Sequence, residues 1–137
     1  MATTTATWQG DMSFAMDLQG FSFVVDADES VGGTNQGPRP KALMLSALAG
    51  WTGMHVVSIL KKMQMPFDRL EISVDGDTAS DHPKVYSSVT VVYSFWGDAL
   101  DESKINKAVQ LSQDKYCGVS ATMKAVGEVK HEIRLNP

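Results

Sequence analysis

The run of residues 42–60 most constrains what this chain can fold into, because it is apolar over almost the roughly 20 residues that a bilayer-spanning helix needs. It is interrupted by six small or polar residues: Ser46, Gly50, Thr52, Gly53, His55 and Ser58. Pro40 suits the first turn of a helix and Pro66 ends one. We therefore expect a helix from about Pro40 to Met63 or Met65, buried on most sides in a globular protein, and no membrane span.

Alternating apolar residues predict strands before this helix. One strand ends near Trp8, a second runs to Leu18, and a third covers residues 21–25 after a turn at Gln19 and Gly20. Residues 26–40 are rich in Gly, Pro and acidic residues, so we expect a loop there.

The second half of the chain predicts two strands, two helices and a final strand. Residues 70–74 and 85–95 form an expected hairpin, with a turn at residues 75–77 closing the first strand. Asp101 is a good N-cap for a helix whose inward positions are Ile105, Ala108, Val109 and Ser112. A short helix over 120–126 and a strand over 129–135 follow.

This order of elements is α+β and lacks the regular alternation of a doubly wound sheet. We expect one domain over residues 1–137. A helix that is apolar nearly all round needs cover on several sides, and a partner subunit can supply it in a chain this short. We therefore expect a homodimer.

Charge and cysteine content exclude several functions. The net charge of -4 argues against binding to nucleic acid or to an anionic membrane. A single cysteine, Cys117, makes neither an intramolecular disulfide nor a zinc knuckle. No basic, apolar leader is evident at the N-terminus, so we expect a cytoplasmic protein.

Trp51 and His55 are the first candidate site, since residues four apart lie on the same face of a helix. An indole beside an imidazole suits a small-molecule site, and two packed core residues explain the same spacing. In the loop, the amides of residues 32–40 beside Arg39 could face an anion, or the loop could be a plain connection.

The remaining candidates give weaker signals. His131 shares the apolar parity of the last strand, so we expect it to point inward or into an interface. His55, His82 and His131 have no metal-ligand spacing, and we expect no metal and no cofactor. Cys117 follows a helix C-terminus, where nothing lowers a thiol pKa, so a buried or idle thiol is the default interpretation.

Three stretches, residues 37–62, 81–86 and 114–120, resemble the OsmC/Ohr family of osmotically inducible and organic hydroperoxide resistance proteins. The likeness covers nearly the whole chain. It implies antiparallel sheets wrapped around two central helices in an intertwined homodimer, with the active sites at the dimer interface. It further implies a peroxidatic cysteine at the position of Trp51 and a resolving cysteine at Cys117.

A tryptophan cannot attack a peroxide, so the two-thiol cycle cannot run here. His55 stands where similar sequences have Asp, which points to an engineered or repurposed site. We expect general-base proton abstraction from a small aromatic molecule, with His55 as base and Trp51 as stacking surface. Leu48, Thr52, Met54 and Arg39 are the expected pocket lining. The alternatives are a natural family member that binds a small apolar ligand, and a residual thiol peroxidase acting through Cys117.

Overall fold

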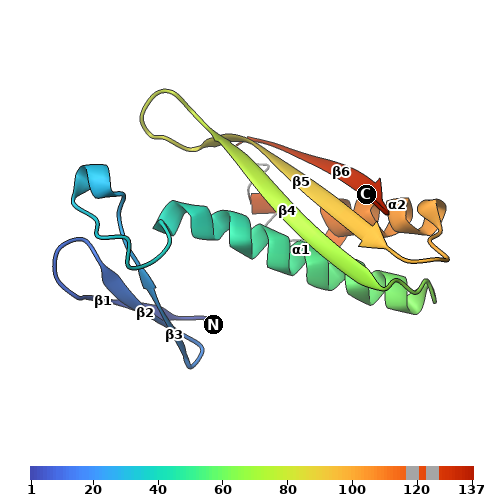
Figure 1. Cartoon of the computed structure of the whole chain (residues 1–137), viewed down its shortest axis with the longest axis horizontal. Coiled ribbons are helices and arrows are strands. Elements are labelled where there is room, and N and C mark those ends of the chain that lie inside the picture. The colour runs from blue at the N-terminus through green and yellow to red at the C-terminus, as the bar shows by residue number, and fades with distance from the viewer. Residues whose placement is uncertain (117–120, 123–126) are drawn as a thin grey trace. The chain divides into compact units, whose positions relative to one another are not determined.

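The computed structural model, shown in Figure 1, describes residues 1–116, 121–122 and 127–137. Its contacts divide the chain into two compact units, Met1–Met44 and Leu45–Pro137. Each unit contains a three-stranded sheet. The fold is α+β, as the order of apolar patterns predicts.

The N-terminal unit is an antiparallel sheet in the order β1-β2-β3. Its strands are β1 (Thr4–Trp8), β2 (Phe14–Leu18) and β3 (Phe21–Val25), which confirms the three predicted strands. Gln19 and Gly20 join β2 to β3 with φ angles of 52° and 84°. Two positive φ angles in a two-residue turn match the twist of the flanking strands, and a glycine takes one of them without strain.

The two faces of this sheet differ sharply in polarity. Strand register places Trp8 beside Phe14 and Leu18 beside Phe21 on one face. The opposite face carries smaller and more polar side chains such as Thr7. Trp8 is 64% exposed and Phe21 75% exposed, so these two side chains of the apolar face are open to solvent.

The loop after β3 is organised by the buried carboxylate of Asp26. Asp26 Oδ1 accepts the backbone N–H of Ala27 at 2.8 Å, and Oδ2 accepts those of Thr34 and Gln36 at 3.1 Å each. The Gln36 bond is the largest cause that holds the pKa of Asp26 below its ordinary value of 3.8, the Thr34 and Ala27 bonds add to it, and desolvation opposes it. The predicted anion for the loop amides is thus the chain's own carboxylate.

The C-terminal unit has the sheet order β4-β5-β6. β4 (Arg69–Thr78) and β5 (Tyr86–Trp96) pair antiparallel, as the predicted hairpin requires. β6 (Glu128–Leu135) pairs parallel to β5, so the expectation of antiparallel sheets is wrong for this one. The reason is that β5 and β6 are joined by a crossover that includes a helix, which brings the chain back in the same direction.

The predicted turn at residues 75–77 is also wrong, since β4 continues to Thr78. Gly76 lies within β4, and the ring of Tyr86 packs against it. A Cβ at residue 76 would approach Tyr86 Cδ1 to 2.7 Å. This glycine therefore makes room for an aromatic side chain instead of breaking the strand.

Two helices belong to the core of this unit. α1 (Leu43–Lys62) follows a short 3-10 turn, Pro40–Ala42, close to the predicted start. α2 (Glu102–Leu111) begins as predicted, with Asp101 Oδ1 accepting the backbone N–H of Lys104 at 3.2 Å. A π-helical segment, Ser112–Tyr116, continues α2. Most of the helix expected over 120–126 lies outside the described residues.

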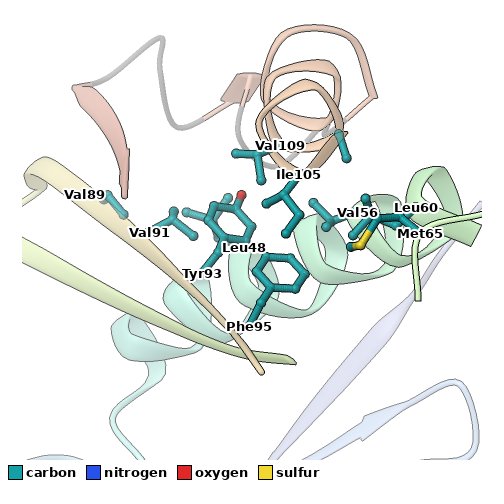
Figure 2. Close-up of a cluster of buried hydrophobic side chains, with 11 residues drawn as sticks. Leu48, Val56, Leu60, Met65, Val89, Val91, Tyr93, Phe95, Ile105 and Val109 are labelled. Carbon is teal, nitrogen blue, oxygen red and sulfur yellow. The ribbon is translucent and has the colours of Figure 1, made fainter. Parts of the chain in front are cut away.

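Figure 2 shows the core that joins α1, α2 and β5. Side chains at every second position of β5 meet the buried faces of both helices. The fully buried members are Leu48, Val56, Leu60, Val91, Tyr93, Phe95, Ile105, Ala108 and Val109. The inward positions predicted for α2 are all confirmed, Ser112 included.

α1 is buried on one side only, in contrast to the expected burial on most sides. Its buried residues, Leu48, Thr52, Val56 and Leu60, recur every four residues. Among the described residues, this is the single helix long and apolar enough to cross a bilayer by length and composition, and 28% of its most apolar window is buried. Apolar side chains on the opposite face are therefore exposed to solvent, such as Met54 at 73%.

The Asp26 carboxylate gives a pH prediction. A group with a lowered pKa stabilises the fold above its ordinary value of 3.8, and this contribution is lost as the pH falls through the lowered value. We expect Asp26→Asn to melt below the original protein at neutral pH, with the gap closing at acid pH. Thermal unfolding followed by circular dichroism between about pH 2 and 7 tests this.

The exposed Asp98 provides the control, since Asp98→Asn should change little at any pH. A gap between Asp26→Asn and the original protein that stays the same at all pH values would show that the loop does not depend on the carboxylate charge.

Candidate functional site

The outward face of α1 carries a stripe of four chemically useful side chains. Trp51, His55, Ser58 and Lys62 are spaced four, three and four residues apart, which is the spacing of one helix face. We call these residues the α1 stripe. The stripe points away from the core, because Thr52 and Val56, the residues that follow Trp51 and His55 in sequence, are fully buried.

Trp51 and His55 stack against each other within the stripe. Their ring centroids are 6.2 Å apart and their planes differ by 19°. This separation lies in the range of direct aromatic contact, so the two rings touch instead of holding a third ring between them. Trp51 remains 46% exposed, whereas His55 is half-buried and its Nε2 atom is buried.

A cavity of about 330 Å³ opens beside His55, between α1 and the end of α2. Its lining combines three polar side chains with three apolar ones: His55, Ser58, Lys62, Ile59, Met63 and Leu111. Cavities of this size accept a small organic molecule. The apolar residues supply contact area for a ligand. The polar residues lie in a row along α1, so a ligand with polar groups would be oriented along the helix.

A second hollow of about 560 Å³ follows the other side of the exposed α1 face. It is lined by Gly53, Met54, Val57, Ser58 and Lys61. Its floor is mostly apolar, and Met54 is the most exposed side chain among the large apolar residues of α1.

Behind the stripe lies a buried polar cluster, which consists of Thr52, Tyr93, Ser112 and Gln113. Thr52 Oγ1 lies 3.2 Å from Tyr93 Oη and 3.2 Å from Ser112 Oγ. Gln113 Nε2 donates to Tyr93 Oη at 2.7 Å. These bonds link α1, β5 and the segment after α2, so they fix the rotation of α1 about its axis.

The family model described as "OsmC-like protein" matches residues 33–132, which is most of the chain. The chain belongs to the OsmC-like family. Its α+β fold with two sheets and two helices is the fold of that family.

Individual relatives of this OsmC-like chain are distant in sequence. Protein YhfA of Escherichia coli K12 is 25% identical over 97 residues, which cover 71% of this chain and 72% of YhfA. A hypothetical protein from Aquifex aeolicus has a TM-score of 0.85 at 24% identity, with 100% of this chain and 98% of the other covered. The organic hydroperoxide resistance protein OhrB of Bacillus subtilis has a TM-score of 0.71 at 21% identity and 98% coverage of both chains.

Several residues predicted for the site lie elsewhere in this OsmC-like structure. Leu48 and Thr52 are fully buried in the core, whereas Met54 lines the second hollow. Arg39 belongs to the N-terminal unit, where Nη1 donates to the carbonyl oxygen of Gly37 at 2.7 Å and Nη2 to Asn35 Oδ1 at 3.0 Å. Cys117 lies outside the described residues.

For His131 the prediction is an inward or an interfacial position, and the chain by itself tests only the inward one. His131 has the inward parity of β6 and pairs with Val91, yet it is exposed in the chain. β6 is the edge strand of its sheet, so its side chains have neighbours on one side only. Among the described residues, no group of three or more His, Cys, Asp or Glu is placed to hold a metal ion.

Sequence reasoning missed Ser58, Lys62 and the buried polar cluster. The spacing of Ser58 and Lys62 from His55 was available as a signal, because it continues the helix face that Trp51 and His55 begin. Tyr93 and Gln113 gave no such signal, since their meeting with Thr52 depends on how β5 and α2 pack on α1.

The buried polar cluster predicts energetic coupling between Thr52 and Tyr93. Thr52→Val and Tyr93→Phe each remove one partner of a buried hydrogen bond, and we expect each to lower the unfolding free energy by about 1–3 kcal/mol. The double variant should lose less than the sum of both, by about 1 kcal/mol. Denaturant unfolding of the four proteins measures this.

A second pair of substitutions on β5, Ser88→Ala and Tyr93→Phe, is the control. The two residues lie apart, so their losses of unfolding free energy should be additive. Losses that are fully additive for Thr52 and Tyr93 would contradict a linked cluster.

Proposed function

We propose that this OsmC-like protein is a general-base catalyst that takes a proton from a small aromatic substrate. His55 is the base, and Trp51 is the surface on which the substrate stacks. The observation that carries the proposal is the near-parallel contact of the two rings beside the cavity that His55 lines. The family resemblance implies a two-thiol peroxidase with its peroxidatic cysteine at the position of Trp51, and a tryptophan supplies no thiolate.

The surroundings of His55 suit a base. A histidine side chain is the group that most often serves as a general base in enzymes. None of the described residues that line the cavity is a carboxylate, which would hold the ring as an imidazolium. Ile59, Met63 and Leu111 add apolar surface next to the imidazole, which favours an aromatic substrate there.

Trp51 has two parts in this proposal. Its indole contacts the imidazole and restrains the plane of that ring, which sets the direction of the in-plane lone pair. A substrate ring that lies in the imidazole plane is then nearly parallel to the indole, whose exposed half extends the apolar surface around the site.

Kinetics with 5-nitrobenzisoxazole test the base. His55→Ala should lower kcat/KM by about a hundredfold or more, because the proton acceptor is lost. In the unaltered protein the rate should rise with pH and level off once the base has lost its proton. Trp51→Ala should raise KM more than it lowers kcat.

His82→Ala is the matched control, since His82 is exposed in the loop between β4 and β5 and should not affect the rate. Cys117→Ser should leave the rate unchanged. A rate that is flat with pH, or that survives in His55→Ala, would overturn the proposal.

A second function is favoured by one observation. The hollow beside Met54 and Val57 is large and mostly apolar, which suits a natural family member that binds a small apolar ligand without chemistry. The same kinetics separate the two functions, because binding of an aromatic molecule without turnover supports this one. Turnover of cumene hydroperoxide with a thiol, abolished in Cys117→Ser, would instead support a residual peroxidase.

We also propose that the working form is a homodimer. Two apolar surfaces support it: the face of the N-terminal sheet that carries Trp8 and Phe21, and the exposed face of α1 around Met54. A monomer with both surfaces in water loses the stabilisation that burial of large apolar side chains supplies. A second copy offers the same surfaces in return, as a two-fold interface requires. A cytoplasmic location stays a prediction.

Sedimentation equilibrium tests the dimer. The protein should sediment with twice the mass of the chain, and Phe21→Lys should shift it toward the monomer because a charge enters the apolar face. Thr7→Lys places the same charge on the opposite face and should leave the dimer intact. A monomeric unaltered protein at micromolar concentration would contradict the proposal.

A further inference from the structure

We propose that Lys62 and Ser58 form an oxyanion-binding end of the His55 cavity, so that the substrates are those in which proton loss moves negative charge onto an oxygen atom. This inference rests on the proposed general-base function and adds the substrate class to it. It starts from the lining of the cavity, in which one imidazole, one hydroxyl and one ammonium face the same space.

The three polar groups are arranged in order along α1. His55, Ser58 and Lys62 lie three and four residues apart, so the ammonium side chain starts two turns after the base, about 10 Å along the axis. Helical side chains lean toward the N-terminus of their helix. The long side chain of Lys62 therefore extends back toward His55, and Ser58 lies between them.

Ile59, Met63 and Leu111 complete this space with apolar walls. A flat aromatic body fits between such walls, with its acidic C–H at the imidazole and its oxygen at the lysine end. The polarity of the cavity thus selects a molecule that carries an acidic C–H and a leaving oxygen on the same flat ring.

The step for a benzisoxazole shows how the charges move. The imidazole of His55 takes the proton from C3, and the C–H electron pair becomes the new C–N bond of a nitrile. The N–O bond breaks and its electron pair stays on oxygen, which gives a 2-cyanophenolate. The imidazolium then returns the proton to water, so no oxidant or reductant is needed.

An ammonium is needed at this place because of the helix itself. Lys62 is the last residue of α1 and lies at the negative end of the helix dipole. A phenolate would be repelled there without a neighbouring cation. The ammonium of Lys62 offsets that repulsion, and the hydroxyl of Ser58 donates a second hydrogen bond to the developing charge.

A leaving-group series tests this assignment. Lys62→Met should lower kcat/KM by about tenfold, less than the loss expected for a buried donor, because Lys62 is exposed. The loss should be larger for the unsubstituted benzisoxazole than for the 5-nitro compound, since more charge then rests on the leaving oxygen. Ser58→Ala should act in the same direction and more weakly.

Lys107→Met is the control, because Lys107 is exposed on α2 and is not among the residues that line this cavity. It removes the same charge and should change neither the rate nor the leaving-group dependence. An equal loss for all leaving groups in Lys62→Met, or the same loss in Lys107→Met, would overturn the oxyanion role.

Binding of 4-nitrophenolate separates this inference from the proposed base, because it needs no turnover. The protein should shift bound nitrophenol toward its coloured phenolate form, and Lys62→Met should abolish the shift whereas His55→Ala retains it. A Lys62-dependent shift in a protein without elimination activity would keep the oxyanion site and reject the base. No shift in the unaltered protein would reject the site itself.

Discussion

Packing of the buried face of α1 against β5 and α2 determines the rest of the site. Leu48, Val56 and Leu60 are fully buried, and burial of each such side chain contributes about 1.5–3 kcal/mol. The outward contact between Trp51 and His55 is worth about 0.5–1.5 kcal/mol at most. The rotation of α1 is therefore set by its buried face, and the direction of the α1 stripe follows from it.

Because the buried face of α1 makes most of the stabilising contacts, residues on its outward face can change while the fold stays the same. Neither Trp51 nor His55 belongs to the core. Thr52 lies between them in sequence and faces the opposite way, into bonds with Tyr93 and Ser112. New chemistry on the stripe thus costs little stability, because the buried polar cluster holds the helix from behind.

Much of the fold could be predicted from the sequence, since alternation and helical spacing report which side chains face inward. The hairpin from β2 to β3 and the Asp101 cap are local features and were predictable. The parallel pairing of β6 with β5 was not, because it depends on the path of a long connection. The sequence predicts a turn at Gly76, because a glycine that makes room for Tyr86 and a glycine that ends a strand have the same local sequence pattern.

The site shows the same limit. Trp51 and His55 were found because their spacing is local, and Ser58 and Lys62 could have been found by extending that spacing. The anion bound by the loop amides was not predictable, because Asp26 precedes Gln36 by ten residues and only the folded loop joins them.

The central claim is that the α1 stripe binds an aromatic molecule through Trp51 and His55 together. The most direct measurement is an NMR titration with 5-nitrobenzotriazole, a flat aromatic molecule of the same ring size that has no N–O bond to break and so does not react. The account predicts that the Trp51 indole N–H and the His55 ring signals shift together, with one saturation curve, and that His55→Ala weakens the binding. Shifts confined to residues away from the stripe, or none at either ring, would contradict it.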